Sequence, residues 1–271
     1  MTKFYLIFTY AVGFYLLIVL LIFLFQRSLL YLPYKEKIDE SFFSNTGLKQ
    51  VEFSTSDGHV LKSLYKKPSS MDMKTILLFH GNAGHAGHRA NKFKFFLDRG
   101  YGLLLVEYRG YGENKGKPSE EGFYNDGIAA INFLSQKNIT TKNIIVYGES
   151  LGCGISVKLS TEFSFYSTIL EAPFTSISEV AQNHYWYLPA KWLVWDRHEI
   201  LGIIKNIKSP LLVIHGKQDK IIKVELGQKI FEKAPEPKQF LLIKNAGHNN
   251  IYDFSIKEKI FSFLDKRKNI H

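Results

Sequence analysis

The chain carries a serine, an aspartate and a histidine in settings that suit nucleophilic catalysis: Ser150, Asp219 and His248. Ser150 stands at the centre of a Gly-x-Ser-x-Gly segment, residues 148–152. A serine hydroxyl is a poor nucleophile at neutral pH, so it needs a base to take its proton and a carboxylate to hold that base in one tautomer. We therefore predict Ser150 as the nucleophile, Asp219 as the acidic member and His248 as the base, an order that recurs in such sites.

The residues around Ser150 indicate a strand, a sharp turn and a helix. Residues 143–147 form a β-branched apolar run typical of a buried strand, and residues 153–161 read as a helix. Glycines on either side of the serine let the strand and the helix approach closely, because glycine has no Cβ. The backbone N–H of Leu151 then opens the helix and is predicted to stabilise the negative charge that develops on an attacked carbonyl.

A second backbone donor is expected in the loop His80-Gly81-Asn82-Ala83-Gly84, which follows an apolar strand at residues 75–79. We predict that the N–H of Asn82 completes the oxyanion hole. The histidines at 80, 85 and 88 suggest a metal cluster as an alternative, but two glycines make this loop a tight turn. One cysteine in the whole chain excludes an intrachain disulfide and a cysteine-based zinc site. We predict neither a metal nor a cofactor.

Other residues compete for roles at the site. Glu171 also follows a predicted strand and is an alternative acidic member, although Asp219 has the better loop context. His215 lies in the same loop as Asp219 and is predicted to be structural. Arg109 is expected to fix its own glycine-rich loop through hydrogen bonds to backbone carbonyls, and Cys153 is expected to be a small core residue.

Strands and helices alternate from residue 75 onward, which predicts an α/β fold with a mostly parallel, doubly wound sheet. A hairpin pattern at 49–54 and 59–65 places two antiparallel strands ahead of it. In such sheets ligands bind beyond the carboxyl ends of the strands, where the candidate residues fall. Residues 173–207 break the alternation, contain all three tryptophans and are predicted to form a small helical cap. Its aromatic residues either line an acyl or aryl pocket or pack the cap onto the body.

The first thirty residues differ from the rest of the chain. From Phe4 to Phe25 there is no charged residue, and the run has the ~20 residues that a helix needs to cross a bilayer. A cleaved signal peptide is the alternative, but its apolar region is about 7 to 15 residues long and ends in a small-x-small cleavage site. We therefore predict a transmembrane anchor with its flank at 1–30 and a catalytic domain at 31–271. The positive-inside rule favours a cytoplasmic body.

The chain is basic, with a net charge of +10 and a pI of about 9.4. Its lysines are scattered and form no stripe with interleaved aromatic residues, so we expect no nucleic-acid partner. Attraction of the basic surface to anionic lipid headgroups explains this charge more simply. The sequence leaves the oligomeric state open.

Six segments together resemble the membrane-anchored α/β-hydrolase-domain serine hydrolases of the bud-emergence (Bem) type, over roughly residues 45–265. The segments are His80-Gly81-Asn82-Ala83-Gly84, Tyr108-Arg109-Gly110-Tyr111-Gly112, Pro118-Ser119-Glu120-Glu121-Gly122, Gly148-Glu149-Ser150-Leu151-Gly152, Pro173-Phe174-Thr175-Ser176-Ile177 and Gly247-His248-Asn249. The resemblance implies the α/β-hydrolase fold and the same three roles for Ser150, Asp219 and His248. Cys153 departs from it, because these proteins usually have glycine there. Related members remove fatty acyl groups from protein cysteines, cleave simple esters or act on peptides.

These observations predict a single-pass, membrane-anchored serine hydrolase that cleaves a lipophilic ester or thioester through an acyl-enzyme on Ser150. Peptidase-like cleavage is one alternative. The other is a non-catalytic, membrane-bound interaction protein on the same fold, although a decayed site is expected to have lost at least one of its three catalytic side chains.

Overall fold

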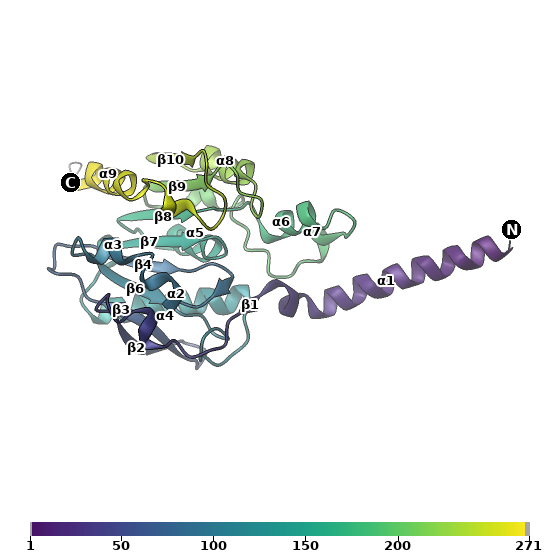
Figure 1. The fold of residues 1–271 in the computed structure, drawn as a ribbon, viewed down its shortest axis with the longest axis horizontal. Helices are drawn as coiled ribbons and strands as arrows, with labels where there is room; N and C mark the ends of the chain where they lie inside the picture. Colours follow the sequence, from purple (N-terminus) through teal and green to yellow (C-terminus); the bar gives the residue numbers. More distant parts are fainter. Residues whose placement is uncertain (1, 269–271) are drawn as a thin grey trace.

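The computed structural model describes residues 2–268 and contains one eight-stranded sheet with helices on both faces (Figure 1). The strands lie in the order β10-β9-β8-β7-β4-β6-β3-β2. Their bounds are β2 Lys49–Ser54, β3 Val60–Lys66, β4 Thr75–Phe79, β6 Gly102–Val106, β7 Ile144–Glu149, β8 Ser167–Glu171, β9 Leu211–Gly216 and β10 Lys238–Ile243. All neighbours from β6 to β10 pair in parallel, whereas β2 and β3 are antiparallel. The predicted fold class is confirmed.

Each central strand is buried on both faces because its apolar side chains alternate between two helical layers. On β4, Ile76 and Leu78 belong to the cluster that includes α3 (Lys94–Leu97) and α9 (Lys257–Lys268). Leu77 and Phe79 point the other way, toward α4 (Glu120–Gln136) and α5 (Gly152–Glu162). Helix α8 (Val224–Lys233) covers the same face beside β9. This double cover explains why the strands are continuous apolar runs.

The segment before β6 does not form one continuous helix. It forms two single turns, α2 (Gly87–Ala90) and α3, separated by residues 91–93. Phe93 has φ −98° and ψ 2°, and both Phe93 and Phe96 are fully buried. Packing of these two rings against the sheet therefore takes precedence over helix continuity.

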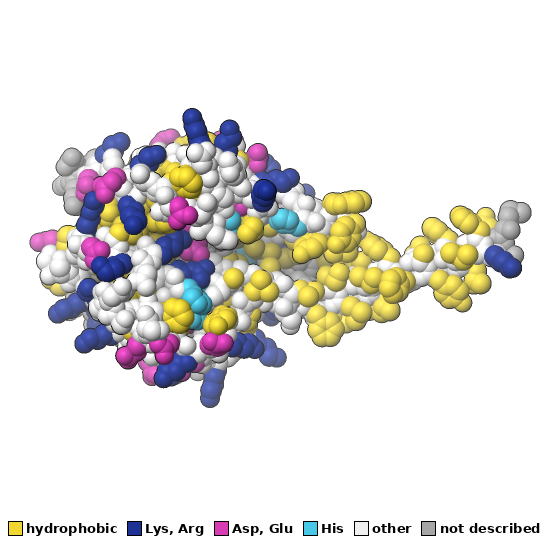
Figure 2. Space-filling view, viewed as in Figure 1, with side chains coloured by type: hydrophobic (Ala, Val, Ile, Leu, Met, Phe, Trp, Pro, Cys, Tyr) yellow, Lys and Arg dark blue, Asp and Glu magenta, His cyan; other side chains and the backbone are white. Residues whose placement is uncertain are grey.

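Helix α1 (Thr2–Leu30) extends away from the body (Figure 1). Residues Lys3–Leu30 are long and apolar enough to cross a membrane, and the most apolar stretch has none of its residues buried against the rest of the protein. A membrane anchor and a signal sequence both satisfy this description. The cap helices α6 (Ile177–His184) and α7 (Ala190–Leu193) lie beside its carboxyl-terminal part, and hydrophobic side chains gather over both (Figure 2).

A second, two-stranded sheet joins α1 to the body. It pairs β1 (Leu32–Pro33) in parallel with β5 (Ala83–Gly84). The side chain of Asn82 reinforces this junction, since its Nδ2 donates to Leu30 O at 2.7 Å and its Oδ1 accepts from Leu32 N at 3.2 Å. The chain is therefore extended directly after α1, and its partner strand lies in the predicted oxyanion loop.

Candidate active site

Ser150, His248 and Asp219 form one hydrogen-bonded chain at the carboxyl edge of the sheet. The Ser150 hydroxyl donates to His248 Nε2 over 3.2 Å, and His248 Nδ1–H donates to Asp219 Oδ2 over 2.7 Å. Because a carboxylate only accepts, Asp219 fixes the tautomer of His248 and leaves Nε2 free to take a proton. Residues that lie 98 apart in the sequence are in contact here.

The turn after β7 aims the serine. Ser150 has φ 50°, a left-handed conformation that costs a non-glycine residue energy and that recurs at functional sites. Its neighbours explain why glycines flank it: a Cβ on Gly152 would lie 2.0 Å from the carbonyl oxygen of Phe79, and one on Gly148 would lie 2.7 Å from Cys153 Cα. The strand, the turn and α5 therefore meet without space for another methyl group. Cys153 is fully buried behind them, as expected.

Asp219 is held in place by more than the histidine. Its Oδ1 accepts from the backbone N–H groups of Ile221 and Ile222, both at 2.8 Å. Burial alone would raise the pKa of Asp219, but hydrogen bonds from His215 and His248 outweigh it and hold the pKa well below its ordinary value. His215 itself is fully buried, with Nε2 2.9 Å from Ile222 O, which agrees with a structural role. The carboxylate is therefore ionised across the neutral pH range.

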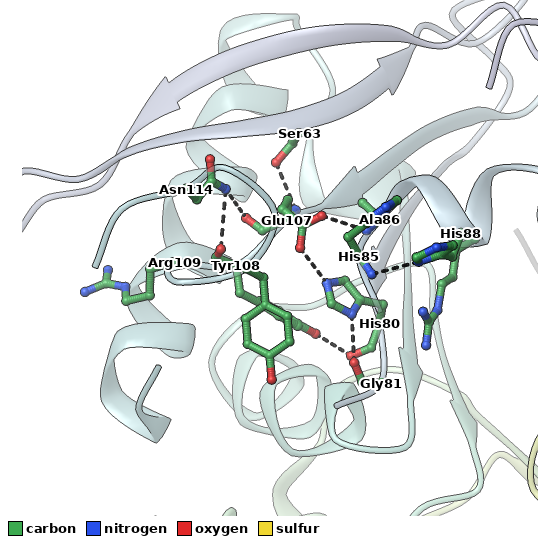
Figure 3. A network of polar contacts seen from close by, with 12 residues as sticks. Ser63, His80, Gly81, His85, Ala86, His88, Glu107, Tyr108, Arg109 and Asn114 are labelled. Carbon is green, nitrogen blue, oxygen red and sulfur yellow. Dashed lines mark hydrogen bonds and ion pairs between the residues drawn. The ribbon is translucent and has the colours of Figure 1, made fainter. Parts of the chain in front are cut away.

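The loop predicted to supply the second oxyanion donor runs past the nucleophile. A Cβ built on Gly81 would lie 3.5 Å from Ser150 Cβ, an ordinary contact, and 3.0 Å from Glu149 Oε1, which is tighter than usual. A buried network fixes the loop from behind (Figure 3): His80 bridges Gly81 O at 2.7 Å and Glu107 Oε1 at 3.1 Å. Asn82 follows Gly81 and is anchored through its side chain as described above, while Leu151 begins the first turn of α5 and is buried.

The three histidines of this region do not converge. His80 faces Glu107, while the rings of His85 and His88 stack on each other with centroids 3.8 Å apart. The backbone N–H of His85 donates to His88 Nδ1 over 3.2 Å. Across residues 2–268, no group of three or more His, Cys, Asp or Glu side chains is arranged to hold a metal ion.

An ionic network that the sequence reasoning missed lies beside the nucleophile. Arg89 Nη2 contacts Glu149 Oε1 at 2.8 Å, and Lys92 Nζ contacts Glu149 Oε2 at 2.9 Å and Glu171 Oε1 at 2.7 Å. Burial would raise the pKa of Glu149, but the charges of Lys92 and Arg89 hold it well below its ordinary value. One signal was available, since an acidic residue at the end of a buried apolar strand, directly before the candidate nucleophile, needs a partner.

Ser150 and His248 line a cavity of about 190 Å³ together with this network. Two larger cavities, of about 820 and 770 Å³, lie around Met73 and Tyr101 at the opposite edge of the sheet and contain none of the predicted site residues. The tryptophans of the cap do not line the cavity beside Ser150. They are exposed instead, Trp186 by 80% and Trp192 by 77%.

Two competing interpretations are decided by the contacts. Glu171 faces Lys92 and accepts from the Tyr147 hydroxyl at 2.6 Å, so its carboxylate is engaged away from His248. Arg109 does not bond to backbone carbonyls as predicted. Its guanidinium pairs with the carboxylates of Asp57 and Asp126. The prediction for Arg109 was wrong because its partner Asp57 belongs to the leading hairpin, a contact that local sequence does not reveal.

The fold and this serine-centred site define the class: the chain belongs to the α/β-hydrolase family of serine hydrolases. Residues 72–198 match the family model described as serine aminopeptidase, S33. Pyrococcus furiosus esterase shares the fold, with a TM-score of 0.70 and 20% identity over 88% of this chain and 98% of that one.

Within the family, the chain is similar to proteins from bacteria and vertebrates. It is 34% identical over 227 residues to an uncharacterized protein of Mycobacterium tuberculosis, covering 83% of this chain and 81% of the relative. It is 31% identical over 202 residues to human alpha/beta hydrolase domain-containing protein 17B, covering 73% and 68%. It is 32% identical over 194 residues to a lysophosphatidylserine lipase of Danio rerio, covering 64% and 50%.

Proposed function

We propose that the protein is a membrane-anchored hydrolase of carboxylic esters or thioesters. In this proposal Ser150 is the nucleophile, His248 the general base and Asp219 the residue that orients the base. The observation that carries the proposal is the continuous chain from Ser150 Oγ through His248 to Asp219, with links of 3.2 and 2.7 Å.

The reaction proceeds in two balanced steps. Ser150 Oγ attacks the carbonyl carbon while His248 takes the hydroxyl proton, and the N–H groups of Leu151 and Asn82 stabilise the resulting oxyanion. The bond from carbon to the leaving oxygen or sulfur then breaks, and His248 passes its proton to that atom. Water enters with His248 again as base, and its attack on the acyl-enzyme releases the acid and restores the serine. No redox partner or cofactor takes part.

The anchor is proposed to stay attached to the body. Arg27 forms an ion pair with Asp196 of the cap at 2.8 Å, and Gln26 Oε1 accepts a hydrogen bond from Trp195 N at 2.7 Å. The side chain of Tyr31 lies in the core, where only 2% of its surface is exposed. Removal of the apolar helix as a signal peptide would delete several of these ties, which favours a retained anchor. We therefore propose an anchor with its flank at 1–30 and a hydrolase domain at 31–271 with a cap at 173–207. We also propose that the chain belongs with the serine hydrolases of the Bem type, on the six segments described above.

A lipophilic acyl group at a bilayer surface is the proposed substrate feature. Hydrophobic side chains of the cap region lie next to the apolar surface of α1 (Figure 2). The cap tryptophans are exposed, and aromatic side chains of this kind favour the membrane–water interface. The name of the Danio rerio relative, a lysophosphatidylserine lipase, is consistent with such a substrate.

The body is proposed to face the cytoplasm. Cys153 is the only cysteine and is buried, so a Lys115→Cys variant probed with an impermeant maleimide reports the side directly.

The test of the proposed function is labelling of the purified full-length protein with a fluorophosphonate probe, beside Ser150→Ala. We expect labelling that disappears in the variant, followed by turnover of p-nitrophenyl esters and acyl thioesters. Turnover of amide analogues at rates equal to esters would favour the peptidase alternative. A folded wild-type protein that does not label would refute the proposal and leave the non-catalytic interaction protein as the better explanation.

A further inference from the structure

The cavity of about 190 Å³ beside the candidate nucleophile is lined by both Ser150 and His248. His248 lines it, and His248 is the residue that must deliver a proton to the departing atom. The predicted oxyanion donors at Leu151 and Asn82 are not part of its lining. A substituent in this cavity is therefore the alcohol or thiol portion of the substrate rather than its acyl chain.

The walls of the cavity are ionic but balanced. Arg89 and Lys92 provide two positive charges, and Glu149 and Glu171 provide two carboxylates, all joined by contacts of 2.7 to 2.9 Å. These side chains are 3 to 24% exposed, so they are largely removed from bulk water. Ala172 supplies the only apolar side chain among the described residues of the lining.

The size of the cavity limits what can enter. Its 190 Å³ corresponds to about six water molecules at roughly 30 Å³ each. A head of the size of glycerol fits, and the ionic wall disfavours an acyl chain, which would remove water from charged side chains without replacing its hydrogen bonds. The polar cavity can therefore select the leaving group independently of the chain length.

The chemistry of the wall distinguishes among leaving groups of this size. An apolar group would strip water from ionised side chains without replacing its hydrogen bonds. An anionic group would face Glu149 and Glu171, and a cationic group would face Arg89 and Lys92. Hydroxyl groups both donate and accept, so they can bond to the cations and the carboxylates together without adding charge.

Resting on the proposed ester hydrolysis, we propose that this cavity is a subsite for a small, uncharged, hydroxyl-bearing leaving group, so that the preferred substrates are acyl esters of a polyol such as glycerol. Lys92 and Glu149 are its specificity-determining side chains. In the reaction the acyl carbon–oxygen bond breaks, His248 protonates the polyol oxygen and water supplies the hydroxyl of the released fatty acid.

Three esters with one acyl chain test this proposal: monodecanoylglycerol, propyl decanoate and decanoyl glycolate, presented to the full-length enzyme in the same detergent micelles. One hydrogen bond to a charged group is worth about tenfold in rate or more. We expect kcat/KM for the glyceryl ester to exceed that of both other esters by at least about tenfold. An S-decanoyl cysteine peptide, tested alongside, should also be a poorer substrate than the glyceryl ester.

Two variants assign the selectivity to the wall. Lys92→Met should lower the ratio of kcat/KM for the glyceryl ester to that for the propyl ester toward one. Glu149→Gln leaves the wall with a net positive charge, so it should raise the ratio of kcat/KM for the glycolate ester to that for the glyceryl ester by about tenfold. Arg99→Gln is the matched control, because Arg99 pairs with exposed Glu258 far from the cavity. It should leave both ratios at the wild-type values.

The outcomes separate the subsite from the proposed function. Fluorophosphonate labelling releases only fluoride and does not need the subsite. A labelled enzyme that prefers the propyl, glycolate or thioester substrate, or that cleaves none of them, overturns the subsite. The comparison of the esters uses the wild-type enzyme, so it tests the subsite even where a variant does not fold. An enzyme that is folded and not labelled refutes the proposed function itself, and the subsite with it.

Discussion

Replacing Gly152 with alanine tests whether close contact between α5 and β4 positions the nucleophile. The new Cβ would lie 2.0 Å from the carbonyl oxygen of Phe79 and 2.6 Å from its carbonyl carbon. Carbon–oxygen contacts normally require about 3.3 Å or more, so the helix and the strand must separate by more than about 1 Å. Phe79 directly precedes the loop of His80 and Gly81, and Gly152 begins the helix behind Ser150. The displacement therefore separates the nucleophile from the proposed oxyanion loop.

The size of the effect follows from the nature of the obstacle. Overpacking in a core typically costs about 1–3 kcal/mol, and here backbone atoms stand on both sides of the clash, so no flexible side chain can move away. We expect Gly152→Ala to lower the free energy of unfolding by about 3 kcal/mol. A misplacement of about 1 Å at reacting groups can cost about 10²-fold in rate, which is the loss we expect in fluorophosphonate labelling.

The measurement combines denaturant unfolding with the second-order rate of labelling in detergent. Gly202→Ala is the matched control, because its Cβ would meet Glu199 Cγ at 3.4 Å, an ordinary contact. It should keep the wild-type labelling rate and unfolding midpoint. Wild-type behaviour of Gly152→Ala in both measurements would show that the close approach at this turn does not position the serine.

Three further predictions concern the anchor, the acidic residue and pH. Arg27→Gln should destabilise the cap by about 1–3 kcal/mol, because the side chain of Asp196, which is 6% exposed, loses its charged partner. A double-mutant cycle with Asp196→Asn should show a favourable coupling free energy between the two residues. Additive effects of the two substitutions would mean that the pair contributes nothing to stability. Asp219→Asn should reduce labelling by about 10⁴-fold, since the base loses its tautomer restraint; retention of more than a tenth of the rate would refute this role. Because the folded pKa of Glu149 lies below its ordinary 4.5, its contribution to stability is complete above that pH and is lost as the pH falls toward the folded value. Unfolding measured across this acidic range should therefore be less pH-dependent in Glu149→Gln than in the wild-type protein, and equal slopes would contradict the argument.

The sequence predicts the sheet well because each strand carries its own signal. A buried parallel strand must be apolar on both faces, so runs such as residues 75–79 are recognisable without knowledge of their neighbours. The same holds for Ser150, where the two glycines, the apolar strand and the following helix are all within a few residues. Asp219 and His248 could be chosen because each follows a strand that itself was predictable.

Contacts between distant elements could not be predicted in this way. Arg109 and Asp57 are 52 residues apart, and Lys92 reaches Glu171 across 79 residues. Nothing in the local pattern around Lys92 distinguishes it from the many exposed lysines of the chain. Its side chain enters the site from the short connection between α2 and α3, beside the buried rings of Phe93 and Phe96.

The cap illustrates a related limit. Its tryptophans suggested either a pocket lining or packing onto the body, and composition alone could not choose between them. The structure leaves Trp186 and Trp192 mostly exposed, whereas Trp195 packs edge-on against Phe23 of α1 with ring centroids 5.0 Å apart. The apolar composition of the cap thus relates to its surroundings more than to the cavity at Ser150.

The hydrogen-bonded junction between α1 and the body has a geometric consequence. Leu30, Leu32 and Asn82 connect the helix to the hydrolase domain through a paired strand, with no free spacer between them. If α1 crosses a bilayer as proposed, Ser150 is held at a constant height and orientation relative to the membrane surface. Such an enzyme cannot reach up to a scissile bond carried far above the lipid. Encounters then depend on lateral diffusion of substrates whose ester bonds lie at the matching depth.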